Sequence, residues 1–199
     1  MTKLQQPVPA GLQRLRAALG DCPWGEDLPM SQPLPQLPKP EFVLIHVEAP
    51  SEVPAQIAVD LGETGIPAGL IGYEYRPLSE AVFLEGIGER GLVAIATSGL
   101  FGRIAVDVAT GHLVQIPKID SARAPRLVNS DLGSFNQCVA AVIARFPFYA
   151  DGDEDRYEAA AEELRDLISG IDEAALAHNG FWETFCDDVA MGDYEDWDA

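Results

Sequence analysis

The stretch GIGERG at residues 86–91 is the pattern most suggestive of chemistry, because it formally satisfies the dinucleotide-binding motif G-x-G-x-x-G. In that motif the glycines end a strand and open a helix, whose N-terminus receives the pyrophosphate. Here the stretch leads into LVAIAT, which is typical of a strand, and Glu89 would repel a phosphate. The pattern therefore predicts a loop between two strands.

Side chains that bind metals do not gather at ligand spacing. The histidines have no cysteine partner at the spacing of a zinc site; they are His46, His112 and His178. The acidic run DGDED at 151–155 resembles the beginning of a calcium loop, and Glu162 occupies its twelfth position. The sixth position, however, requires glycine and holds Arg156. The sequence therefore predicts neither a bound metal nor a cofactor.

Nucleophiles and paired carboxylates give an equally weak signal. Ser98 in ATSGLFG lacks the G-x-S-x-G pattern of a nucleophile elbow. Asp60 and Glu63 in DLGET would be a carboxylate pair, but a strand end followed by a turn commonly carries such residues for local hydrogen bonds. We therefore expect no enzymatic activity. The hypothesis of an enzyme that uses Asp60 and Glu63 is the least favoured of the three functional hypotheses considered below.

Negative charge is the strongest global feature of the chain. The formal net charge is −19, and residues 147–199 hold 17 of the 32 acidic residues beside only two basic ones, Arg156 and Arg165. Such a field repels nucleic acid and anionic membranes, and it attracts basic partners. We therefore expect a protein partner rather than nucleic acid or a membrane.

Length and composition suit one globular domain. The chain has 199 residues and is 47% hydrophobic, enough for a core that needs no disulfide or metal. Its three cysteines are scattered, which argues against a disulfide framework. The N-terminus lacks a hydrophobic signal core, and no apolar run approaches the roughly 18 residues of a membrane span. We expect a cytoplasmic protein.

Hydrophobic periodicity predicts the elements that position these residues. Short segments rich in valine and isoleucine predict strands at 42–47, 56–61, 81–86, 92–97, 103–108 and 112–117. The last two are joined by a short loop with Gly111, which predicts a hairpin. Apolar residues at helical spacing predict helices at 131–146, 156–169 and 173–188. Strands followed by helices favour an α+β fold with a mostly antiparallel sheet.

The junction LVNSDLGSF at 127–135 turns from strand to helix within a few residues. Asn129 and Ser130 are good N-cap residues, because their side-chain oxygens accept bonds from orphan backbone N–H groups. Asp131 places a carboxylate in the first turn, where the helix dipole favours negative charge. We interpret the junction as joining the sheet to its covering helix rather than as a catalytic site.

The two ends of the chain differ from its centre. Residues 9–19 predict a short helix, and six prolines within 23–40 predict an extended connector. The expected organisation is a helix and proline-rich lead-in at 1–40, a single α+β domain at 41–190 and an acidic tail at 191–199.

In their order, several stretches resemble the SUKH superfamily, and within it the fourth SUKH immunity group of bacterial polymorphic toxin systems. The matching stretches are DLGETGIP (60–67), RIAVDVATGHLVQI (103–116), LVNSDLGSFNQCV (127–139) and GIDEAALAHNGFWETF (170–185). The resemblance rests on their order and spacing rather than on a single motif. It implies an α+β fold with a twisted sheet flanked by helices and without catalytic residues.

The resemblance also implies that the protein neutralises a toxin by binding it, in a family associated with nuclease and nucleic-acid deaminase toxins. Such toxins need a basic groove for phosphates, which an acidic inhibitor complements. We expect a basic cognate toxin domain as partner and a monomer when free; a non-catalytic regulatory adaptor of the same fold is the alternative. The candidate toxin-binding residues are Asp151, Asp153, Glu154, Asp155, Glu158, Asp187, Asp188, Asp193 and Glu195.

Overall fold

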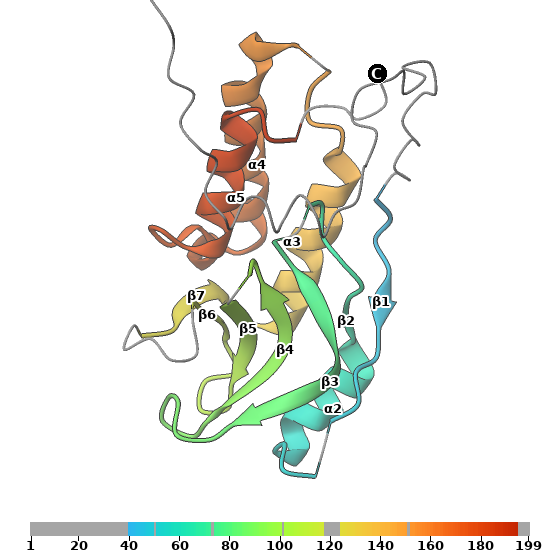
Figure 1. Cartoon of the computed structure of the whole chain (residues 1–199), viewed down its shortest axis with the longest axis vertical. Coiled ribbons are helices and arrows are strands. Elements are labelled where there is room, and N and C mark those ends of the chain that lie inside the picture. Colours follow the sequence, from blue (N-terminus) through green and yellow to red (C-terminus); the bar gives the residue numbers. More distant parts are fainter. Residues whose placement is uncertain are drawn as a thin grey trace, which may run out of the picture. The chain divides into compact units, whose positions relative to one another are not determined.

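The computed structural model describes residues 40–49, 51–72, 74–100, 102–117, 124–150 and 152–194. The described fold belongs to the unit Leu37–Ala199. The expected helix at 9–19 lies outside the described residues, as does the proline-rich segment apart from its last residue. Figure 1 shows a β-sheet with helices packed beside it, and the expected α+β fold class is confirmed.

A five-stranded antiparallel sheet forms the centre of this unit. Its strand order follows the chain: β3 (Arg76–Leu84), β4 (Leu92–Ser98), β5 (Gly102–Asp107), β6 (Leu113–Ile116) and β7 (Arg126–Asn129). Each strand pairs with the next one because short connections favour adjacent antiparallel strands. The stretch GIGERG connects β3 to β4, which confirms its interpretation as a loop between two strands.

The β5–β6 hairpin is confirmed at the position that the sequence predicts. The Asp107 carboxylate accepts the backbone N–H groups of Ala109 and Thr110, at 2.7 and 3.3 Å, and so closes the turn. Gly111 has a φ of 77°, a left-handed conformation that glycine adopts without steric cost. Local chemistry is therefore sufficient to fix this register.

Both faces of the sheet bury apolar side chains. Strand alternation directs Val93 and Ile95 of β4 into the main core, while Leu92 and Ala94 join a smaller cluster on the opposite face. The smaller cluster also contains Ala105, Val114 and Ile116, with Leu78, Leu84 and Ile87 packed against it. The apolar surface of the strands is therefore divided between two cores.

Three helices follow the sheet, each with one buried face. They are α3 (Leu132–Arg145), α4 (Tyr157–Ile171) and α5 (Phe181–Ala190), with the 3-10 turns η1 (Glu154–Arg156) before α4 and η2 (Glu173–Leu176) before α5. The expected continuous helix at 173–188 is therefore wrong. Asn179, with a φ of 54°, interrupts it, because a left-handed residue cannot continue a right-handed helix.

The cap of α3 differs in detail from the expected one. The N-cap residue is Asp131, not Asn129 or Ser130, and its carboxylate accepts the backbone N–H of Ser134 at 2.7 Å. The Ser134 hydroxyl in turn accepts the backbone N–H of Asp131, which completes a capping box. Asn129 and Ser130 are consequently free to bond elsewhere.

The strand expected at 56–61 is a helix, α2 (Ala55–Thr64). Ile57, Val59 and Leu61 alternate along the sequence, which imitates a strand. In the structure Ile57 and Leu61 are buried, four residues apart on one helical face, whereas Val59 is exposed. Short apolar stretches fit both the repeat of a strand, about 2 residues, and that of a helix, about 3.6 residues. Here tertiary burial selects the helix.

The strand expected at 42–47 is much shorter than predicted. Only Leu44–Ile45 forms β1, which pairs antiparallel with β2 (Ile66–Pro67) in a separate two-stranded sheet. The stretch DLGETGIP therefore ends a helix and enters β2, rather than ending a strand.

A buried carboxylate joins two distant parts of the chain. Asp172, 8% exposed, lies between α4 and η2, and it accepts the backbone N–H of Ser130 at 2.7 Å and the Asn129 amide at 3.0 Å. The Asn129 side-chain oxygen accepts the indole N–H of Trp182 at 2.8 Å. The junction at 127–135 thus connects the sheet to α3, η2 and α5, in agreement with its structural interpretation.

Packing continues into the segment that we expected to be an acidic tail. Tyr194 is buried, with its ring against Phe185 and Phe148, and its backbone N–H donates to the Tyr149 hydroxyl at 3.1 Å. Among the described residues, none of the helices has the length and apolar character needed to cross a membrane.

Candidate functional site

The acidic residues that the sequence singled out lie on and around two neighbouring helices. α4 and α5 run side by side in Figure 1 and pack directly on each other. Asp153 to Glu158 lie at η1 and the first turn of α4; Asp187 and Asp188 lie on α5, and Asp193 follows it. Asp151 and Glu195 lie outside the described residues. Two regions about thirty residues apart in sequence therefore form one surface, which we call the α4–α5 face.

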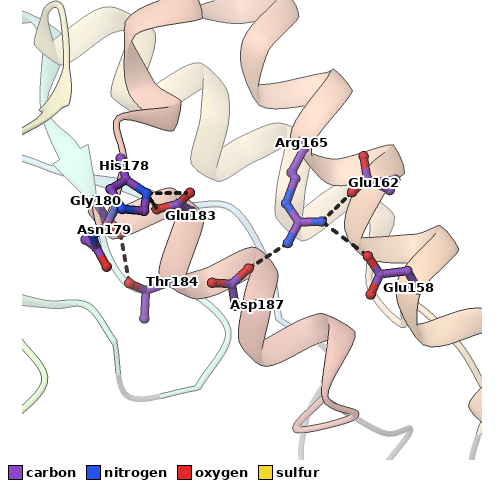
Figure 2. A network of polar contacts seen from close by, with 9 residues as sticks. All are labelled: Glu158, Glu162, Arg165, His178, Asn179, Gly180, Glu183, Thr184 and Asp187. Atoms are coloured by element: carbon purple, nitrogen blue, oxygen red, sulfur yellow. Dashed lines mark hydrogen bonds and ion pairs between the residues drawn. The ribbon is translucent and has the colours of Figure 1, made fainter.

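Arg165 joins the two halves of the α4–α5 face, as Figure 2 shows. Its guanidinium bonds the Asp187 carboxylate of α5 at 2.6 Å and the Glu162 carboxylate of its own helix at 2.6 Å. Glu158, one turn earlier on α4, lies 3.8 Å from the same group. Sequence reasoning selected Glu158 and Asp187 but missed Glu162 and Arg165. The signal was present, because residues 158, 162 and 165 are spaced to share one helical face.

The electrostatics of this group leave an excess of negative charge. Burial alone would lower the pKa of Arg165, but the hydrogen bonds that it donates to Asp187 and Glu162 raise the pKa, so the guanidinium stays charged. One cation faces three carboxylates, and the carboxylate side chains are more than half exposed. Exposed pairs of this kind contribute little to stability. Their main effect is to hold acidic groups in place at the surface.

A second acidic group lies where α5 ends. Burial raises the pKa of Asp188, and the neighbouring charges of Asp193 and Asp187 raise it further. Glu74, which precedes β3, has its pKa raised by burial and then by the charge of Asp188. These carboxylates repel one another, and a cation placed among them would relieve that repulsion. The arrangement therefore favours contact with a basic side chain.

The polar contacts before α5 hold a turn next to the sheet. Glu183 accepts the backbone N–H of Asn179 and lies 3.4 Å from His178, while the Thr184 hydroxyl donates to the Gly180 carbonyl at 2.9 Å (Figure 2). Arg126 of β7 donates to the Asn179 carbonyl at 2.7 Å and holds this turn against the sheet. These bonds fix the turn before α5 and its position against the sheet.

The remaining candidates for chemistry are dispersed. Within the described residues, no three His, Cys, Asp or Glu side chains are placed to hold a metal ion. Burial raises the pKa of Cys138 to about 11 and that of Cys186 to about 12, so both thiols stay protonated near neutral pH. Asp60 borders a pocket of about 320 Å³ between α2, the β5–β6 hairpin and α3, whereas Glu63 is exposed and does not line it. The carboxylate pair that an enzyme would require therefore does not converge on this pocket.

Comparison with known proteins identifies a family. A family model described as SUKH-4 immunity protein matches residues 49–188. The matched region contains the five-stranded sheet, α2 to α4 and all but the last two residues of α5. It therefore includes every described candidate residue except Asp193. No curated protein and no solved structure matches the chain.

Proposed function

Because the chain belongs to the SUKH-4 immunity protein family, we propose that its immunity role is directed against a toxin that acts on nucleic acid or nucleotides, a deaminase or a nuclease. The protein neutralises this toxin by direct binding, without catalysis, as a cytoplasmic monomer. The observation that carries the proposal is the α4–α5 face, where acidic residues from two parts of the chain form one exposed surface.

Charge complementarity supplies the mechanism. A toxin that handles nucleic acid requires a basic groove for phosphates, and a negative surface on the inhibitor occupies that groove in place of the substrate. Such complementarity also steers the two proteins together and raises association from about 10⁵–10⁶ to about 10⁸–10⁹ M⁻¹s⁻¹. Fast capture matters because free toxin damages the cell until it is bound.

Rescue of growth tests the proposal directly. We expect a toxin domain to be encoded immediately upstream of this chain's gene and to stop growth when it is expressed alone. Co-expression of this protein should restore growth. We also expect the purified pair to co-elute as a complex, because neutralisation here depends on binding.

The control is an unrelated acidic protein expressed at the same level, which should not rescue. If the toxin domain remained active in the presence of an excess of this protein, the immunity proposal would be wrong and the regulatory adaptor would replace it. If the toxin modified neither nucleic acid nor nucleotides, only the toxin class would be wrong.

A further inference from the structure

β3 is an edge strand of the five-stranded sheet, with β4 as its partner on one side. On the other side the described residues provide one backbone contact, in which Ala81 donates its N–H to the Glu48 carbonyl at 2.9 Å. Backbone groups of alternate residues point to the same side of a strand, so those of Phe83 face the same edge. Beyond Ala81, none of the described residues pairs with this edge.

An open groove of about 420 Å³ lies along this part of β3. The strand residues Glu80 to Phe83 line it, together with Glu85 just after the strand and Glu52 from the loop before α2. Val82 is 47% exposed and presents an apolar side chain at the groove. The groove thus combines backbone that is unpaired among the described residues, three apolar side chains and three glutamates.

The charge of the groove decides what can occupy it. None of the described residues that line it is basic, and its three carboxylates are exposed. A second copy of this chain would bring the same glutamates against each other, which opposes pairing between edges. An extended segment with lysine or arginine at alternate positions would instead face them with opposite charge.

We propose that the open edge of β3 is a docking site for an extended basic segment of the toxin, which adds to the sheet as a further strand along residues 82–85. Main-chain hydrogen bonds hold the segment, and its basic side chains meet Glu52, Glu80 and Glu85. The inference rests on the proposed function for the identity of the partner. It names a contact on the sheet, separate from the α4–α5 face.

The test uses the toxin domain encoded immediately upstream, inactivated in its own catalytic site, as the probe. Glu80→Lys combined with Glu85→Lys is expected to weaken equilibrium binding by at least about 10-fold, because positive charges along the edge would repel the basic segment. Glu63→Lys combined with Glu173→Lys changes the net charge equally at exposed positions elsewhere and is expected to change binding by less than about 3-fold.

Amide hydrogen exchange provides the second measurement. The Phe83 amide is expected to exchange quickly in the free protein and to become protected in the complex, since strand addition gives it an acceptor. Equal binding by the edge variant and the wild type, with Phe83 still exchanging quickly, would overturn the inference but leave the proposed function intact. Weakened binding without protection would also overturn strand addition, as would concentration-dependent protection in the protein alone, which would indicate a second copy at the edge. A wild-type protein that does not bind the toxin domain would overturn both proposals.

Discussion

Replacing Asp172 by alanine is expected to lower the free energy of unfolding by about 3 kcal/mol, because it removes the shared acceptor of several donors, among them the buried amide of Asn129. The carboxylate accepts bonds from the Asn129 amide, from the backbone and hydroxyl of Ser130, and from the Ser134 hydroxyl. Asn129 is fully buried, so its amide cannot turn to water once the acceptor is lost. An unsatisfied buried donor costs about 1–3 kcal/mol.

Denaturant-induced unfolding measures this effect. The matched control is Asp166→Ala on the exposed surface of α4, which should shift the unfolding free energy by no more than about 0.5 kcal/mol. A loss of less than about 1 kcal/mol for Asp172→Ala would show that the connection between the sheet and the C-terminal helices does not depend on this carboxylate.

The same carboxylate predicts a pH dependence. Burial alone would raise the pKa of Asp172, but hydrogen bonds from Ser130 and Asn129 outweigh burial and lower it below its ordinary value of 3.8. A carboxyl group with a depressed folded pKa stabilises the fold fully above its unfolded pKa, and this contribution is lost as the pH falls through the folded pKa. The difference in unfolding free energy between wild type and Asp172→Ala should therefore narrow as the pH is lowered below 3.8.

Neutralising the α4–α5 face is expected to slow toxin association by about 10-fold at low salt, because exposed charges at an interface act mainly through steering. The variant combines Glu154→Gln, Asp155→Asn, Asp188→Asn and Asp193→Asn, which leaves the partners of Arg165 unchanged. The dissociation rate should change by less than about 2-fold. The dependence of association on salt should flatten, since such charges are screened beyond about 8 Å at physiological ionic strength.

A control of equal charge separates a local effect from the total charge of the protein. It combines Glu41→Gln, Glu63→Gln, Glu89→Gln and Glu173→Gln, all at exposed positions away from the face. Stopped-flow mixing with the inactivated toxin domain measures both variants. Equal slowing by the two variants would attribute steering to net charge alone, and no slowing by either would rule out capture by charge.

The fold of the face variant should remain intact. The pKa of Asp188 is raised by burial and by Asp193 and Asp187, which means that its charged form is disfavoured where it lies. Removing the charge of Asp188 relieves this repulsion. The Asp188→Asn substitution should therefore not lower the unfolding free energy of the variant. Circular dichroism of the variant should accordingly match that of the wild type.

Elements whose signals are local could be predicted from the sequence alone. The β5–β6 hairpin follows from alternating strands, the Asp107 turn and Gly111, all within fifteen residues. Helices α3 and α4 follow from long apolar stripes at helical spacing, with ends within two residues of those predicted. The concentration of acidic residues after position 147 is likewise a property of the chain alone. In each case the interacting residues are close in sequence, so the local sequence pattern is enough to predict the structure.

Tertiary structure decided the features whose partners are distant in sequence. The alternation of Ile57, Val59 and Leu61 fits a strand, which would place all three side chains on one face. The structure buries Ile57 and Leu61 but exposes Val59, and a helix separates them in this way. Asp172 has no recognisable partner in sequence, yet it accepts bonds from residues 38 to 43 positions earlier. Arg165 similarly brings Asp187 to Glu158 across two helices. Local propensity cannot encode such contacts, because they form only after apolar burial has brought the elements together.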